Sequence, residues 1–174
     1  MRWSRNIFLV GPMGAGKTTV GRHLASSLGF QFEDSDHEIQ RRTGVDIPTI
    51  FEFEGESGFR ARECKVIDDL TRREGLVLAT GGGVIMDPDN RRRLSSRGLV
   101  VYLFCSAEQQ FERTAKDRNR PLLQTEDPYA RLSELMQVRD PLYRQAADLI
   151  VSTEKRSAAS VCREIMRKLE KGVD

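Results

Sequence analysis

Residues 11–18, with the sequence GPMGAGKT, match the spacing GxxxxGK[ST] of a phosphate-binding loop. In this pattern the glycines let backbone N–H groups curl around phosphate oxygens, the lysine neutralises the outer phosphates, and the hydroxyl binds Mg²⁺. Here these residues are Gly11, Gly16, Lys17 and Thr18. A plain glycine turn between a strand and a helix would not explain the lysine, so the loop predicts a nucleotide-binding site.

The loop alone does not distinguish a kinase from an ATPase, a GTPase or a motor module. The sequence contains no NKxD-like segment of the kind that recognises guanine. A chain of 174 residues has room for a small acceptor site beside the nucleotide. A kinase must cover such a site, because water would otherwise consume the phosphoryl group. We therefore favour an ATP-dependent kinase of a small molecule.

The segments around the loop alternate between short apolar runs and helical patterns. The apolar runs, interpreted as strands, are 6–10, 30–32, 76–79, 99–104 and 148–152. Helical spacing of apolar residues occurs over 17–29, about 57–74, from about 106, and over 158–169. Parallel strands that are buried on both faces need crossover helices. The pattern predicts an α/β fold with a doubly wound, five-stranded parallel sheet in three layers.

Polar segments follow three of the predicted strands. In doubly wound folds, ligands bind beyond the carboxyl ends of the strands, where the loop 11–18, the DSD segment 34–36 and the glycines 81–83 fall. The segment 113–128 is charged, contains two prolines and lacks apolar periodicity. Long loops of this kind are often active-site lids. We expect a mobile lid there, with a plain exposed connection as the alternative.

The composition is that of a globular chain, with 39% hydrophobic and 31% charged residues. The length favours a single domain over residues 1–174. The 28 basic and 26 acidic residues nearly balance, which gives no reason to expect a nucleic-acid partner. The three cysteines lack the spacing of a disulfide framework or a zinc site. No apolar run is long enough for a signal peptide or a membrane span, so we expect a cytoplasmic protein.

Nearly the whole chain resembles the shikimate kinase family. After GPMGAGKTTVGRHLA, the segments DSD, GFRARE, TGGGV, NRPLL and RDPLY occur in the order and spacing of that family. The resemblance implies a fold like that of the nucleoside-monophosphate kinases, with a lid. It also implies transfer of the ATP γ-phosphate, with Mg²⁺, to the 3-hydroxyl of shikimate in aromatic amino-acid biosynthesis. We expect a monomer whose partner is the small molecule shikimate, without nucleic-acid or membrane contacts.

The resemblance also implies roles for individual residues, within a substrate-binding segment over about 34–62 and a lid over about 113–128. Shikimate has one carboxylate and three hydroxyls, which suit bidentate arginines and a carboxylate acceptor. The implied substrate residues are Asp36, Arg60, Gly81, Gly82, Gly83 and Arg139. The implied nucleotide residues are Gly14, Ala15, Gly16, Lys17, Thr18, Thr19, Arg113, Arg120 and Arg156. The implied catalytic residues are Lys17, Asp36 and Arg120, and the implied Mg²⁺ residues are Thr18 and Asp34.

Some of these residues also suit ordinary structural roles. Asp34 and Asp36 could form a helix N-cap pair, although capping preferences do not explain both together with the phosphate loop. Arg156 could be a solvated surface arginine. Glu63 follows Arg60 by three residues on a predicted helix, which allows an ion pair that orients the arginine.

Two other functions remain open from the sequence. One is a related kinase of another polyol acid such as gluconate, which a panel of acceptors would distinguish. The other is a nucleotide-binding regulatory module that keeps the fold without catalysis. The joint presence of Lys17, Asp36, Arg60 and Arg139 argues against such a module.

Overall fold

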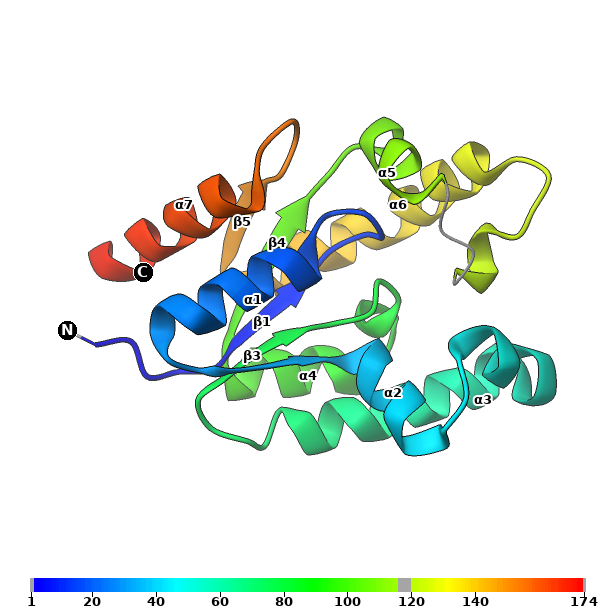
Figure 1. The fold of residues 1–174 in the computed structure, drawn as a ribbon, viewed down its shortest axis with the longest axis horizontal. Helices are drawn as coiled ribbons and strands as arrows, with labels where there is room; N and C mark the ends of the chain where they lie inside the picture. The colour runs from blue at the N-terminus through cyan, green and yellow to red at the C-terminus, as the bar shows by residue number, and fades with distance from the viewer. Residues whose placement is uncertain (1, 116–119, 174) are drawn as a thin grey trace.

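The computed structural model describes residues 2–115 and 120–173 (Figure 1). The strands are β1 (Ile7–Val10), β2 (Gln31–Asp34), β3 (Leu76–Ala79), β4 (Leu99–Phe104) and β5 (Leu149–Ser152). The helices are α1 (Lys17–Leu28), α2 (Ser35–Thr43), α3 (Ile47–Leu70), α4 (Pro88–Arg97), α5 (Ala107–Thr114), α6 (Pro128–Ala146) and α7 (Ala158–Lys171). Two short 3-10 helices are η1 (Val84–Met86) and η2 (Pro121–Leu123). Residues 116–119 of the expected lid lie outside the described residues.

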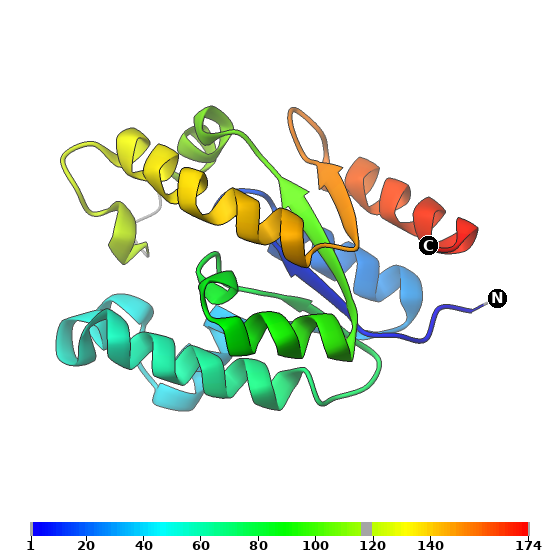
Figure 2. The same ribbon diagram turned by 180° about the vertical axis from the view of Figure 1, so that it is seen from behind.

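The strands form one parallel sheet with the order β2-β3-β1-β4-β5. Helices α1 and α7 lie over the face that Figure 1 shows in front. Seen from behind in Figure 2, α4 and α6 cross the opposite face, and α3 lies beside α4. Helices on both faces of a parallel sheet make a three-layer, doubly wound α/β fold, which confirms the predicted fold class.

Strand β1 is apolar on both of its faces. Phe8 and Val10 pack with residues of α2, α3, α4 and α6. Ile7 and Leu9 pack with residues of α1 and α7. Fully burying a large apolar side chain contributes about 1.5–3 kcal/mol, so both helical layers are held to the same strand. A parallel strand covered in this way reads as a continuous apolar run.

Among the helices that the sequence predicts, α3 differs most from its expected bounds. The apolar spacing predicts a helix over about 57–74, whereas α3 extends from Ile47 to Leu70. Its backbone is non-helical at Gly55, and Asp46 caps its start by accepting the Thr49 N–H at 3.0 Å. The expected lid also contains more structure than a plain loop, because α5 ends at Thr114 and η2 lies within it.

Within the described residues, no helix combines the length and apolar character that a membrane span requires.

Candidate active site

The loop between β1 and α1 contains the predicted phosphate-binding residues. Gly16 has a left-handed backbone and is the N-cap of α1, so the free N–H groups of the first helical turn face the loop. Lys17 Nζ donates to the carbonyl oxygens of Gly11 and Pro12, both at 2.7 Å. Burial lowers the pKa of Lys17 to about 7, and the charge of Arg120 adds to the effect. A bound anion would favour the charged lysine again.

Asp34 makes two kinds of contact at the end of β2. Its Oδ1 accepts the backbone N–H groups of Asp36 and His37 at 2.9 and 3.2 Å, so Asp34 is the N-cap of α2. Its Oδ2 accepts the Thr18 hydroxyl hydrogen at 2.8 Å. The capping interpretation is therefore correct for Asp34, but it uses only one carboxylate oxygen.

The paired oxygens of Thr18 and Asp34 fit a magnesium ion that keeps part of its hydration. Both are hard oxygen ligands, which Mg²⁺ prefers. Within residues 2–115 and 120–173, no group of three or more His, Cys, Asp or Glu side chains could hold a metal. A site with few protein ligands is the kind that Mg²⁺ occupies when substrate phosphates and water complete its shell.

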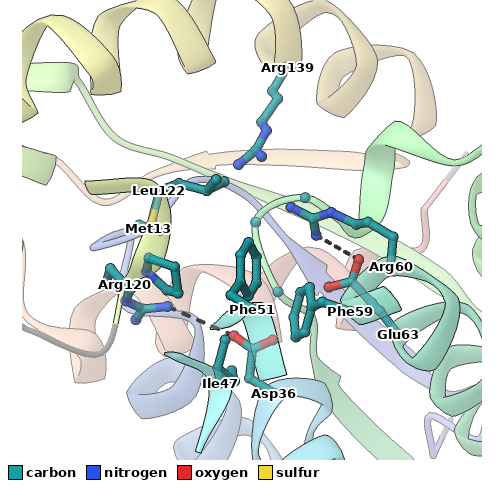
Figure 3. Close-up of a pocket in the computed structure, with 14 residues that line it drawn as sticks. Met13, Asp36, Ile47, Phe51, Phe59, Arg60, Glu63, Arg120, Leu122 and Arg139 are labelled. Carbon is teal, nitrogen blue, oxygen red and sulfur yellow. Dashed lines mark hydrogen bonds and ion pairs between the residues drawn. The ribbon is translucent and has the colours of Figure 1, made fainter. Parts of the chain in front are cut away.

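Asp36 directs its carboxylate into a pocket, away from the α2 cap (Figure 3). Its Oδ2 lies 3.8 Å from Nη1 of Arg120, which belongs to the expected lid. Burial raises the pKa of Asp36, the charge of Asp34 raises it further, and Arg120 and Lys17 oppose this. A carboxylate with a raised pKa accepts a proton more readily than an ordinary aspartate.

Two arginines face Asp36 from the other side of this pocket (Figure 3). Arg60 Nη1 donates to Glu63 Oε1 at 2.8 Å, in the ion pair that the sequence predicts. Burial raises the pKa of Glu63 to about 7, although Arg60 opposes the shift. Arg139 from α6 is only 6% exposed, and burial lowers its pKa. Two guanidinium groups that line one pocket favour an anionic ligand.

The glycine triplet 81–83 lies between these charged groups. A Cβ at Gly83 would come within 2.4 Å of Arg60 Nη1, so the absence of a side chain lets the guanidinium lie there. The Gly81 N–H donates to Ser35 Oγ at 2.9 Å. The Gly82 carbonyl accepts the Tyr143 hydroxyl hydrogen at 2.6 Å. The triplet is therefore fastened to α2 on one side and to α6 on the other.

Two adjoining pockets meet at this triplet. The pocket that holds Arg60 and Arg139 is lined further by Met13, Phe51, Phe59, Glu63, Gly83, Pro121 and Leu122. The pocket at the phosphate loop is lined further by Gly14, Gly16, Lys17, Thr18, Thr19, Asp34, His37, Gln40 and Thr80. Both pockets share Asp36, Ile47, Gly81, Gly82 and Arg120. Two ligands bound side by side would therefore meet at the shared residues. Ala15, another of the implied nucleotide residues, is buried within the loop.

Arg113 and Arg156, two of the implied nucleotide residues, are placed differently. Arg113 donates to the carbonyl oxygens of Gly14 and Thr153 at 2.7 and 3.0 Å, so it joins the phosphate loop to the segment after β5. Arg156 instead pairs with Glu164 of α7 at 2.5 Å and lines neither pocket. Its interpretation as an ordinary surface arginine therefore stays open.

Sequence patterns did not identify two features of the site, which are its apolar wall of Phe51 and Phe59 and the residue Tyr143. Phe51 and Phe59 line the pocket of Arg60 and Arg139, with ring centroids 5.0 Å apart. Helical spacing places Phe59 on an apolar face, but spacing does not distinguish a pocket wall from a core. Tyr143 follows Arg139 by four residues, which sets both on one helix face. That spacing in RDPLY was the available signal.

The fold and these two pockets define a P-loop kinase whose acceptor is small enough to lie beside the phosphate loop. A family model described as shikimate kinase matches residues 13–170. The shikimate kinase of Methylococcus capsulatus is 61% identical over 98% of this chain and 96% of its own. That of Thioalkalivibrio sulfidiphilus is 60% identical over 96% and 88%. The chain belongs to the shikimate kinase family.

Solved structures agree with this membership. A shikimate kinase from Acinetobacter baumannii in complex with shikimate has a TM-score of 0.96 and 54% identity, covering 98% of this chain and 95% of its own. The enzyme from Aquifex aeolicus has a TM-score of 0.84 and 38% identity over 95% and 96%. A gluconokinase from Sinorhizobium meliloti shares only the fold, with a TM-score of 0.58 and 18% identity over 98% and 94%. The chain is thus an ATP-dependent phosphotransferase with an alcohol acceptor, and its place is in the shikimate pathway.

Proposed function

We propose that ATP binds in the phosphate-loop pocket and shikimate in the pocket of Arg60 and Arg139, so that the two meet at the shared residues. The observation that supports this proposal is the presence of Asp36 and Arg120 in the lining of both pockets. The substrate-binding segment 34–62 and the lid 113–128 would then be parts of one kinase domain.

The acceptor would be oriented by its two chemically different ends. Its carboxylate would pair with the guanidinium groups of Arg60 and Arg139, because paired charged hydrogen bonds are strong and directional. Its ring would lie along the wall of Phe51 and Phe59. Its 3-hydroxyl would then donate a hydrogen bond to Asp36, beside the backbone of the glycine triplet.

The transfer needs position and charge more than a strong base. The 3-hydroxyl oxygen forms a bond to the γ-phosphorus, the bond from that phosphorus to the bridging oxygen breaks, and ADP leaves. The hydroxyl proton passes to the Asp36 carboxylate as the new bond forms. Lys17 and Arg120 would stabilise the charge on the transferring group.

The nucleotide side would use the backbone of residues 14–19 for the phosphates. Thr18 would ligate Mg²⁺ through its hydroxyl and Asp34 through water, which fits the contact between their oxygens at 2.8 Å. When bound, the cation neutralises charge on the β- and γ-phosphates. We infer that Arg113 packs against adenine, with Arg156 at the outer end of the same site.

We propose that the enzyme acts as a monomer in the cytoplasm and has no nucleic-acid partner. The phosphate loop, α2, α3 and α6 of the same chain supply charged groups of both pockets, so neither pocket requires a residue from a second copy. The cysteines Cys64, Cys105 and Cys162 are free thiols, as is usual in a reducing compartment. The near balance of 28 basic and 26 acidic residues also gives nucleic acid no evident electrostatic attraction.

A panel of acceptors combined with Asp36→Asn tests this proposal. With MgATP, we expect ADP release to depend on shikimate and not on gluconate. Asp36→Asn should lower kcat about 100-fold or more, the usual effect of a general base, with little change in the KM for ATP. Asp89→Asn, at an exposed position of α4, is the matched control and should keep full activity. Full activity of Asp36→Asn, or a stronger response to gluconate, would contradict the proposal.

A further inference from the structure

Tyr143 lies behind the acceptor pocket, which is the pocket that Arg60 and Arg139 line, and interacts with two parts of its lining. Its hydroxyl donates to the Gly82 carbonyl oxygen at 2.6 Å. The Arg139 guanidinium lies near the same hydroxyl, and its positive charge opposes the rise that burial causes in the pKa of Tyr143. A guanidinium only donates, so the hydroxyl can offer Arg139 only its acceptor lone pairs while it gives its own hydrogen to Gly82. One oxygen thus joins α6 to the loop after β3.

The bond to Gly82 also sets the direction of the next N–H group. The structure has no cis peptide among the described residues, and in a trans peptide the C=O and N–H groups point in opposite directions. Because the Gly82 carbonyl points to Tyr143, the Gly83 N–H points away from it. Within the described residues, the N–H groups of Gly82 and Gly83 donate to no protein acceptor. These two donors remain for a ligand or water at the pocket lining.

The position of the Tyr143 hydroxyl is fixed by packing. The ring is 1% exposed and stacks on Tyr102 with centroids 4.9 Å apart. Tyr102 is also buried, and its own hydroxyl donates to Asp140 Oδ1 at 2.6 Å. The two neighbouring tyrosines therefore make hydroxyl bonds of equal length. Only the bond of Tyr143 ends on a residue that lines the acceptor pocket.

Gly82 is also where the acceptor side meets the phosphate loop. A Cβ added at Gly82 would lie 3.4 Å from Nη1 of Arg139. It would also lie 3.6 and 3.7 Å from the backbone of Gly11 and Met13. A change in the orientation of this peptide would therefore move the acceptor relative to the donor.

We propose that Tyr143 is a positioning residue for the acceptor, because its single hydroxyl fixes the Arg139 guanidinium and the Gly82–Gly83 peptide relative to one another. Tyr143 does not itself line the acceptor pocket and acts through these two groups. This inference rests on the proposed role of Arg139 in binding the carboxylate of the acceptor. It predicts that loss of one hydroxyl weakens binding of shikimate and leaves binding of ATP nearly unchanged.

The test compares Tyr143→Phe with Tyr102→Phe as a matched control. Each variant loses one buried hydroxyl bond, and we expect their thermal midpoints to fall by similar amounts. Tyr143→Phe should raise the KM for shikimate about tenfold, as expected for loss of a buried hydrogen bond that orients groups of the binding site, with the KM for ATP within about twofold. Tyr102→Phe should leave both KM values within about twofold. Equal effects of the two variants on the KM for shikimate would overturn the inference.

Arg139→Ala separates this inference from the proposed function. If Arg139→Ala leaves the KM for shikimate unchanged, the proposed carboxylate site fails, and the inference fails with it. If Arg139→Ala raises that KM and Tyr143→Phe does not, only the inference fails. In the Arg139→Ala background the effect of Tyr143→Phe should shrink, because part of it acts through Arg139. An undiminished effect there would show that Tyr143 acts independently of Arg139.

A further measurement applies if Tyr143→Phe loses its cooperative thermal transition. In wild-type protein labelled with ¹³C in its tyrosine rings, shikimate should shift the resonances of the Tyr143 ring more than those of Tyr102. Equal shifts of both rings, or no shift of the Tyr143 ring at saturation, would overturn the inference.

Discussion

Burial acts in opposite directions on the acidic and basic groups of the site. It raises the pKa of Glu63 to about 7 and lowers the pKa of Lys17 to about 7. It also raises the pKa of Asp36. In each case burial penalises the charged form, which water would otherwise solvate. The charged and neutral forms of Glu63 and Lys17 therefore lie close in free energy near neutral pH, so the charges of bound substrates can decide between them.

Glu63→Gln should change how stability depends on pH. The unfolded chain releases the Glu63 proton near the ordinary value of 4.5, whereas the folded protein keeps it up to about 7. Glu63 therefore costs stability as the pH rises through this window. The free energy of unfolding of Glu63→Gln, relative to wild type, should increase by an amount of the order of 3 kcal/mol between these pH values. Urea unfolding at a series of pH values measures the difference.

Glu38→Gln is the matched control for that series. Glu38 is buried like Glu63, with its side chain 2% exposed. Hydrogen bonds from Arg41 outweigh burial, and with Arg42 they lower the pKa of Glu38 to about 2. Its contribution is present above the unfolded value and is lost as the pH falls toward 2. Glu38→Gln should therefore show no relative gain above pH 4.5, and a gain equal to that of Glu63→Gln would contradict the assignment.

At the scale of elements, the sequence predicts strands better than it predicts α3. The apolar runs 76–79 and 99–104 coincide with β3 and β4, because a strand buried on both faces leaves an uninterrupted apolar signal. The first part of α3 leaves no such signal. Its residues Ile47 and Phe51 face the acceptor pocket, and the glycine at 55 resembles a helix end.

Sequence patterns are limited in the same way for the residues of the site. Spacing alone identifies the phosphate loop, because its residues are neighbours in the chain. Arg60 and Arg139 lie on α3 and α6, and only the packing of these helices brings both to one pocket. Their roles could be predicted only from the family resemblance. The spacing in RDPLY sets Tyr143 on the same helix face as Arg139, but its contact could not be predicted, since its partner is a backbone carbonyl that no sequence pattern marks.

Gly55→Ala should destabilise the protein through the break in α3. Gly55 has φ 71° and ψ −178°, a backbone region that glycine alone adopts readily. A Cβ there would have open space around it, so the cost is backbone strain of about 1–3 kcal/mol. Arg62 pairs with Glu54 across the break at 2.6 Å, which opposes relaxation of the strain. Urea unfolding measures the loss.

Glu52→Ala is the control for this prediction, since Glu52 is exposed on the same helix. Such a surface change should stay within about 0.5 kcal/mol. The KM for shikimate should also rise in Gly55→Ala, because the segment before the break lines the acceptor pocket. If Gly55→Ala is as stable as Glu52→Ala, the break does not depend on glycine.

At the scale of the whole molecule, one sheet supports both pockets. The core with α1 and α7 and the core with α2, α3, α4 and α6 pack on opposite faces of the same strands. Neither core can open without exposing strands of the other, so we expect the described structure to unfold in one transition. A ligand in either pocket then stabilises the entire fold by mass action.

This coupling makes thermal unfolding a test of which pocket binds which substrate. A ligand at about 100 times its Kd adds about 2.7 kcal/mol, which for a chain of this size corresponds to a rise in Tm of roughly 5–10 °C. Wild type should show this rise with shikimate and with MgADP. Arg139→Ala should lose the rise with shikimate at the same concentration and keep the rise with MgADP, because only the acceptor pocket loses its anchor. Arg131→Ala, which breaks an exposed ion pair with Glu134 on the same helix, should keep both. Loss of both rises in Arg139→Ala would mean that the two pockets are not separable in the way the geometry implies.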